Sequence, residues 1–320
     1  MRVSYSLGSL LSIGEVLGCS KILDSARPDT VWIPETWGME NFAMLSAVSQ
    51  VVGCKVGSSI TNIYSRSPAL AAMGAVTVDA LSGGRMVMGL GAGSPPIVGG
   101  LHGMSFERPV ERMREYVEVV RLASSGNRID YSGEFFKLKG FTLIVKPVRE
   151  QIPVYMAAVN RRMLELAWEI ADGALLFLRP LGELRGTIKR MQSRRKIDAA
   201  CQVITAVSHD SEAAAARART TVAFYVSVGS IYREFLAASG FDAEVGNIYG
   251  EYKKSGIEAA AGQVTPRMVS ELAVCGTPDE CRKGIERFAA AGIDLPIIQL
   301  NPVGDALESC RLIASAMEGA

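Results

Sequence analysis

The sequence has few of the side chains on which metal and disulfide chemistry depend. It contains two histidines, and its six cysteines are scattered without a CxxC pair. Scattered cysteines are typical of reduced, mostly buried thiols, and neither histidine has a carboxylate or cysteine at ligand spacing. We therefore expect neither a disulfide framework nor a metal site.

The sequence also lacks a large net charge and long apolar runs. The formal net charge is +1, so there is no electrostatic reason to expect nucleic acid or a membrane surface as a partner. No apolar run reaches roughly 18 residues, and the first ten residues lack the apolar core and cleavage site of a signal peptide. The missing signal peptide and apolar run lead us to expect a cytoplasmic protein.

Residues 58–96 read as two buried strands joined by a helix. Ser67 offers an N-cap oxygen, and Pro68 is pre-set for the first helical turn. Gly83 and Gly84 provide the left-handed residues that end a helix. A strand, a helix and a strand within about 35 residues form a right-handed crossover unit, which predicts parallel neighbouring strands.

Short apolar segments of this kind recur along the whole chain, and most are followed by a helical pattern. Eight strands alternating with helices in 320 residues are typical of a (β/α)8 TIM barrel, which is an α/β fold. The eight segments are residues 3–7, 31–34, 55–60, 85–90, 154–158, 174–178, 202–207 and 296–300.

Two insertions interrupt this rhythm in what we expect to be a single barrel domain, residues 1–320. Residues 94–152, after strand 4, should hold a helix from near Pro109 and a hairpin over 131–146, and residues 210–270, after strand 7, are helical in pattern. A doubly wound sheet is the competing fold. Its dinucleotide fingerprint fails here, because prolines follow the glycine run that ends at Gly93.

Chemistry in such a barrel sits at the C-terminal ends of the strands. The residues expected there are mostly uncharged, and no Ser/His/Asp set, carboxylate pair or ligand cluster stands out. That composition suits a reaction whose difficult chemistry belongs to a bound organic cofactor, while the protein provides positioning and a dry pocket.

Several motifs resemble the luciferase-like barrel superfamily, and within it the archaeal methylenetetrahydromethanopterin reductases that use the deazaflavin coenzyme F420. The resemblance spans nearly the whole chain. It is carried by TNIYSRSPALAA and LSGGRMVMGLGAG, with support from KPVREQIPVYMAA, ADGALLF and CGTPDECRKGIERFAAAGID. The resemblance implies a TIM barrel of the bacterial luciferase-like type.

The resemblance also implies a cofactor-binding segment at the end of strand three. The family places a non-prolyl cis peptide behind the cofactor ring, and here that bond would join Ser59 and Ile60. Thr61 and Asn62 would then offer hydrogen bonds to the cofactor. The same residues can also be read as a simple polar strand end.

The cofactor's phosphate tail would lie at the end of strand five. Ala157, Ala158, Asn160 and Arg161 fall where the family's backbone amides meet that tail. This sequence reads AAVNRR where the family has a small, proline-containing turn, so a different flavin is also compatible. The arginines could equally be the solvated start of a helix.

Three positions are candidates for catalysis or substrate contact. Glu35 falls where relatives have an acidic residue facing the deazaflavin, and a barrel-rim carboxylate in water is an equal alternative. Ser6 and Ser94 stand where the pterin reductases have a glutamate and an aspartate. Replacing both carboxylates removes the obvious groups for proton transfer or for holding a pterin.

The function that follows is F420-dependent oxidoreduction, in which a hydride passes between the deazaflavin and a small organic substrate. The first candidate is the archaeal-type, one-carbon reaction that reduces the methylene to the methyl form of a tetrahydromethanopterin or tetrahydrofolate derivative. An FMN-dependent luciferase-like monooxygenase and a catalytically silent flavin-binding relative remain as alternatives. The family leads us to expect a homodimer or higher homo-oligomer.

Overall fold

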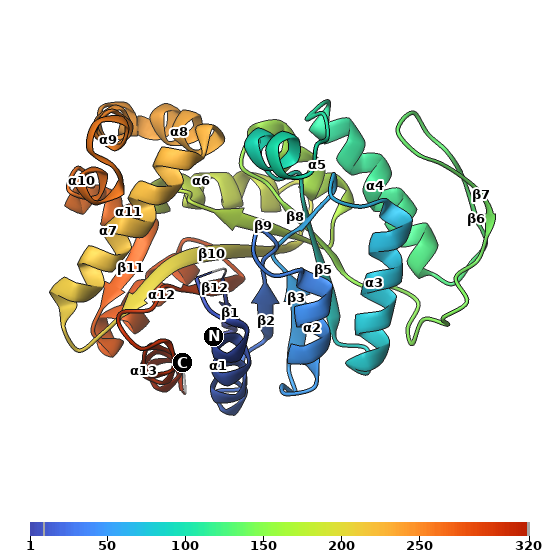
Figure 1. Cartoon of the computed structure of the whole chain (residues 1–320), viewed down its shortest axis with the longest axis horizontal. Helices are drawn as coiled ribbons and strands as arrows, with labels where there is room; N and C mark the ends of the chain where they lie inside the picture. Colours follow the sequence, from blue (N-terminus) through green and yellow to red (C-terminus); the bar gives the residue numbers. More distant parts are fainter. Residues whose placement is uncertain (9, 319–320) are drawn as a thin grey trace.

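Eight parallel strands close into a barrel in the computed structural model, which describes residues 1–8 and 10–318 (Figure 1). Closure follows from β12, which pairs with β1 on one side and with β10 on the other. Each of the eight predicted segments overlaps one barrel strand, so the predicted (β/α)8 fold is confirmed. The strands are β1 (Ser4–Ser6), β2 (Thr30–Ile33), β3 (Lys55–Ser58), β5 (Met86–Gly91), β8 (Val154–Ala157), β9 (Gly173–Phe177), β10 (Asp198–Val207) and β12 (Leu295–Leu300).

Helices surround the barrel (Figure 1). The outward side chains of the strands pack against them in the large outer core. Along each strand the residues alternate between the helical layer and the barrel interior; on β1, for example, Tyr5 belongs to the large outer core, with Val3 and Leu7 beside it. The outer helices are α1 (Ile13–Ser25), α2 (Asn41–Ser49), α3 (Pro68–Leu81), α4 (Pro109–Ser124), α5 (Arg161–Ile170), α6 (Leu181–Gln192), α12 (Pro278–Ala290) and α13 (Ala306–Met317).

The ends of α3 confirm the predicted caps. The hydroxyl of Ser67 accepts the amide of Leu70 at 3.2 Å, and Pro68 begins the helix. The chain leaves the helix through Gly83 and Gly84, whose φ values are 68° and 84°. Because an L side chain rarely adopts such angles, the two glycines stop α3 and turn the chain into β5.

The insertion after β5 contains a π-helical turn, η1 (Pro96–Leu101), then α4 and a hairpin of β6 (Ile129–Ser132) and β7 (Lys137–Phe141). The helix start near Pro109 is confirmed, but the predicted hairpin range of 131–146 is wrong at both ends. Ile129 is buried against α3 and α4, whereas Ile144 is 98% exposed. Burial of its first residue decides where the hairpin begins.

The insertion after β10 is helical, as predicted, and forms a cluster beside the barrel (Figure 1). Its buried centre includes Val222, Phe241, Ile248 and Met268. A short strand, β11 (Ala273–Gly276), follows and pairs with the C-terminal half of β10. The elements are α7 (Ser211–Val228), α8 (Ser230–Leu236), η2 (Ala237–Phe241), α9 (Asp242–Ser255), α10 (Ile257–Ala261) and α11 (Pro266–Leu272).

A layer of packed side chains fills the barrel interior towards the N-terminal ends of the strands. The rings of Trp32 and Tyr155 lie 5.6 Å apart, and Leu175 and Ile297 pack in the same interior cluster. The Tyr155 hydroxyl donates to Asp198, and Arg2 pairs with the same carboxylate at 2.9 Å. The buried hydroxyl and amide side chains described next lie at the C-terminal end of the strands, which we call the barrel mouth.

Candidate functional site

Hydroxyl and amide side chains line the interior just above the packed layer. Ser6 is in register with Trp32 of β2 and with Gln299 of β12, so all three face the barrel interior. The hydroxyls of Ser6 and Ser59 lie 3.4 Å apart. Strand alternation thus brings together Ser6 and Ser59, which are 53 residues apart in the chain, and adds Gln299.

The chain departs from regular strand geometry at the end of β3. Ser59 and Ile60 are joined by a cis peptide bond, as the resemblance predicted. Ile60 packs against the interior cluster, and the next two residues form a short strand, β4 (Thr61–Asn62), that pairs with β5. This brings residues 59–62 to the barrel mouth.

The side chains of residues 61 and 62 are engaged by the protein itself. Thr61 is fully buried, and its hydroxyl accepts from the Asn41 amide at 2.9 Å. The side-chain oxygen of Asn62 accepts the amide of Tyr64, also at 2.9 Å. These hydrogen bonds hold the segment in place, so what it can present to a ligand is chiefly backbone and the Ser59 hydroxyl.

Glycines on β5 make this close approach possible. A Cβ at Gly89 would lie 1.9 Å from the carbonyl oxygen of Ser58, and one at Gly91 would lie 2.5 Å from the Ile60 side chain. Gly93 has φ of 69° and faces the Asn62 amide. The glycine run that failed as a dinucleotide fingerprint therefore accommodates residues 58–62.

Glu35 lies beside this segment in an ion pair with Arg66, and the two side chains are 9% and 12% exposed. Its other carboxylate oxygen accepts the amide of Asn62 at 3.3 Å and the hydroxyl of Ser65 at 3.4 Å. The structure places Glu35 as a clamp on residues 62–66 rather than as a carboxylate in water. Arg66 was not singled out from the sequence.

The predicted tail site lies at the start of α5. Asn160 caps the helix by accepting the amide of Met163 at 2.9 Å, and the amide of Ala158 donates to the carbonyl of Leu175 in β9. The amides of Arg161 and Arg162, in the first turn, have no intrahelical acceptor. A helix N-terminus of this kind favours an anion.

The two arginine side chains at this helix start are paired with carboxylates of the protein. Arg161 is 85% exposed and pairs with Glu165 one turn later, and Arg162 pairs with Glu111 of α4. Their guanidinium groups therefore form a solvated helix surface, which leaves the backbone amides as the groups at this helix start that could meet an anion.

Ser94 lies three residues beyond β5, in the loop before the π-helical turn. Its carbonyl accepts the amide of Val98 at 2.9 Å, which begins the π-helical turn. Within residues 1–8 and 10–318, no hydrogen bond joins the Ser94 side chain to Ser6 or Glu35. The structure thus brings Ser6 and Ser59 together and leaves Ser94 apart from them.

An aromatic wall covers one side of the mouth. Tyr225 of α7 packs edge-on against Phe177 at 4.8 Å, and Tyr232 of α8 packs against both rings at 5.8 Å. Trp37, from the loop after β2, reaches to 6.4 Å from Phe224. The wall is built from residues far apart in the sequence, which is why sequence patterns did not reveal it.

The hydroxyl of Tyr225 gives the aromatic wall a polar contact with the barrel interior. Its hydroxyl accepts from the side-chain amide of Gln299 at 2.9 Å, whereas the buried oxygen of that amide has no partner among the described residues. Burial raises the pKa of the Tyr225 phenol, and the Gln299 hydrogen bond only partly opposes this shift. The phenol therefore stays protonated at neutral pH.

Charges around the mouth are paired within the protein. Arg179, whose side chain is 2% exposed, pairs with Glu183 and donates to the carbonyl of Val159 at 2.7 Å. It also stacks on Phe235 at 4.5 Å. With Glu35 paired as well, the interior presents neutral hydroxyl and amide groups, which can bind and orient an uncharged planar molecule.

Metal and disulfide chemistry are not indicated. No group of three or more His, Cys, Asp or Glu side chains that could hold a metal ion occurs in the part of the chain that the structure describes. All six cysteines are free thiols. None of the described helices combines the length and the apolar character that crossing a bilayer demands.

Comparison of the sequence with known proteins identifies the family of this chain. The profile of the luciferase-like monooxygenases matches residues 2–295. The chain is 31% identical to a 5,10-methylenetetrahydromethanopterin reductase of Archaeoglobus fulgidus over 308 residues, which cover 92% of this chain and 91% of the relative. It is 29% identical to a putative coenzyme F420-dependent oxidoreductase of Mycobacterium tuberculosis, over 86% of this chain and 87% of that protein.

A solved structure supports the fold. The coenzyme F420-dependent tetrahydromethanopterin reductase of Methanopyrus kandleri superposes with a TM-score of 0.87 at 22% sequence identity, over 99% of this chain and 98% of that one. Identity at this level shows a shared barrel architecture and no more.

Proposed function

This chain belongs to the luciferase-like monooxygenase family, and we propose that it is an F420-dependent oxidoreductase. In this proposal a hydride passes between the deazaflavin and a small organic substrate at the barrel mouth. The observation that carries the proposal is the neutral interior formed by Ser6, Ser59 and Gln299 beneath an aromatic wall. Such a site can position reactants but holds no group for difficult chemistry of its own.

The residues at the mouth fit a deazaflavin. Two buried polar atoms, Oε1 of Gln299 and Nε1 of Trp32, have no partner among the described residues, and buried polar atoms normally find one. A ring with carbonyl and N–H groups on its edge would supply both. The first-turn amides of α5 would receive an anionic tail. The bound deazaflavin would supply the carbon that accepts or gives the hydride.

The protein's residues then bind and orient. Ser59, Ile60, Thr61 and Asn62 would support the ring through the backbone held by Glu35. Ala157, Ala158, Asn160 and Arg161 would meet the tail through backbone groups at the strand end and helix start. The aromatic wall would exclude water, which strengthens every polar contact in the site.

The first candidate substrate is a one-carbon pterin, reduced from the methylene to the methyl form. Support comes from the pterin reductases of Archaeoglobus fulgidus and, at 28% identity, Methanolobus tindarius. Ser6 lies at the base of the site, and Ser94, in the loop after β5, would contact the substrate. Both are hydroxyls, so any proton transfer would rely on water or on the substrate.

Cofactor binding tests this proposal first. We would titrate the purified protein with F420 and with FMN and follow the fluorescence of each ligand. We expect saturable F420 binding that is much tighter than FMN binding. The Ser59→Phe variant should lose binding because its ring would fill the space beside Ser6, whereas Ser255→Phe, on the exposed end of α9, should bind normally.

Each other outcome contradicts part of the proposal. Preferential FMN binding would support the monooxygenase alternative, which should then consume oxygen. Binding of neither ligand would indicate a family member without a cofactor. If Ser59→Phe is folded by thermal unfolding and still binds F420, the placement of the ring is wrong. The pterin step needs a second assay, in which deazaflavin absorbance changes only when a methylene or methyl pterin is added.

A further inference from the structure

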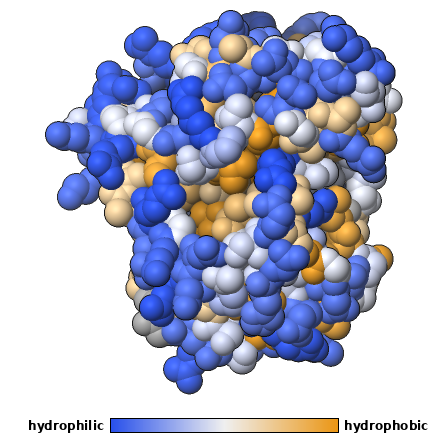
Figure 2. Space-filling view, turned by 90° about the vertical axis from the view of Figure 1, so that its left-hand side faces the viewer, coloured by the Kyte–Doolittle hydropathy of each residue, from blue (hydrophilic) through white to orange (hydrophobic). Residues whose placement is uncertain are grey.

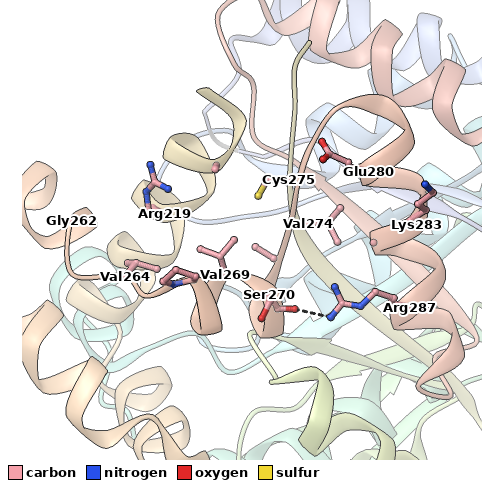
Figure 3. Close-up of a pocket in the computed structure, with 14 residues that line it drawn as sticks. Arg219, Gly262, Val264, Val269, Ser270, Val274, Cys275, Glu280, Lys283 and Arg287 are labelled. Atoms are coloured by element: carbon pink, nitrogen blue, oxygen red, sulfur yellow. Dashed lines mark hydrogen bonds between the residues drawn. The ribbon is translucent and has the colours of Figure 1, made fainter. Parts of the chain in front are cut away.

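A cavity lies outside the barrel, along the edge of β11. Its volume is about 660 Å³, and its walls come from α7 and α11 on one side and α12 on the other (Figure 3). β11 is the last strand of the sheet and pairs only with β10. None of the residues at the barrel mouth lines this cavity, so it is separate from the proposed cofactor site. We call it the β11 groove.

The floor of the β11 groove is apolar. Val264, Val269 and Val274 line it, and Val274 and Cys275 stand on β11 between the two helical walls (Figure 3). Figure 2 looks onto this side of the molecule and shows a hollow with a hydrophobic floor surrounded by hydrophilic residues. Water in such a hollow is readily displaced by an apolar chain.

The rim of the groove carries an excess of positive charge. Lys283 and Arg287 lie one turn apart on α12, and neither forms an ion pair with a carboxylate of the described residues. Arg287 donates only to the carbonyl of Ser270, at 3.2 Å. The groove's carboxylate, Glu280, is already occupied as the acceptor of the α12 capping box.

A third cation at the rim is already neutralised. Arg219 of α7 pairs with Glu212 at 2.6 Å, so it adds little to the field inside the groove. The two cations of α12 therefore remain available for an anion that lies along the apolar floor.

The burial of β11 decides what shape of ligand fits. Ala273 and Val274 are 5% and 4% exposed, so an added peptide strand cannot reach the backbone edge that it would pair with. A slender alkyl chain needs only the apolar side-chain surface. The rim charge, the apolar floor and the buried strand edge together favour a small molecule over a peptide.

We propose that the β11 groove binds a small amphipathic carboxylate, with its alkyl chain along Val264, Val269 and Val274 and its carboxylate at Lys283 and Arg287. The ligand is defined by this chemistry: one anionic head and a chain of medium length. The site is independent of the function proposed for the barrel mouth.

Calorimetric titration with decanoate, below its micelle concentration, tests the proposal on the full chain. We expect saturable binding that the double variant Lys283→Ala/Arg287→Ala weakens by about tenfold or more, equivalent to at least about 1.4 kcal/mol. Both side chains are exposed, so the variant should remain folded. Arg282→Ala, on the same helix but outside the groove lining, is the matched control and should bind decanoate normally.

Two further measurements separate charge from apolar contact. Decanol should bind the wild type no more tightly than decanoate binds the double variant. Decanoate should also slow alkylation of Cys275, which mass spectrometry can follow on its peptide, because this half-buried thiol lines the groove. The proposal is overturned if decanoate does not saturate, if decanol binds equally well, or if the double variant keeps full affinity.

Discussion

Arg66 donates to Glu35, and the other oxygen of that carboxylate accepts the backbone amide of Asn62 at 3.3 Å. This pair links the loop after β2 to the segment that follows the Ser59–Ile60 bond. Glu35, which the sequence suggested as a contact to the cofactor, therefore holds the backbone segment that would support the cofactor.

Loss of this pair should destabilise the protein. Glu35→Gln leaves the mostly buried Arg66 cation without its main partner, so we expect the free energy of unfolding to fall by about 2–4 kcal/mol. Urea denaturation measures the change. Glu40→Gln neutralises a second carboxylate beside Arg66, whose guanidinium also contacts Asn41. The Glu40 side chain is 49% exposed, so this change should cost less than about 1 kcal/mol. Equal losses for the two variants would show that Glu35 is not the clamp.

The hydrogen bond between Gln299 and Tyr225 predicts a smaller effect. Tyr225→Phe should lower the free energy of unfolding by about 1–2 kcal/mol, because the side-chain amide of Gln299 loses its acceptor inside the protein. Tyr232 belongs to the same aromatic wall, but its hydroxyl has no hydrogen-bond partner among the described residues. Tyr232→Phe should therefore change the free energy of unfolding by less than about 0.5 kcal/mol. A larger loss from Tyr232→Phe would contradict this interpretation of the wall.

Gly89 should tolerate no side chain. A Cβ there would lie 1.9 Å from the Ser58 carbonyl oxygen, and backbone atoms cannot move aside cheaply, so Gly89→Ala should lose at least about 3 kcal/mol or fail to fold. Gly246→Ala, in α9 with open space around it, should gain about 0.5–1 kcal/mol from helix propensity. Thermal unfolding of both variants tests the contrast, and a stable, folded Gly89→Ala would refute it.

Alkaline pH should destabilise the protein through its buried thiols. Burial raises the pKa of Cys201 from 9.0 to about 12. The unfolded chain therefore loses this proton first, and stability present below pH 9 declines as the pH rises towards 12. Between pH 8 and pH 10.5 the contribution of Cys201 should fall by about 2 kcal/mol.

Cys201→Ala provides the test of this pH dependence. The cavity that it creates lowers stability at both pH values alike, so only the difference between the two pH values is informative. Urea denaturation at the two values should show a smaller alkaline loss in the variant than in the wild type. Identical losses would mean that this thiol does not contribute.

Much of the fold could be read from the sequence because its local signals agree. Ser67, Pro68, Gly83 and Gly84 mark both ends of α3, and the alternation of apolar strands with helices predicts the barrel. Short-range patterns failed where burial by distant residues decides the outcome. The hairpin begins at Ile129 because that side chain packs against α3 and α4, and β11 forms because β10 extends beyond the barrel to pair with it.

The site shows the same division. The sequence by itself determined the barrel, the cis peptide position and the neutral character of the strand ends, since periodicity, capping residues and family motifs are properties of the chain. Only the tertiary structure decided that Glu35 pairs with Arg66, that Gln299 meets Tyr225 and that Ser6 meets Ser59. Those partners lie between 31 and 74 residues apart, and barrel closure, which no local pattern encodes, is what brings them into contact.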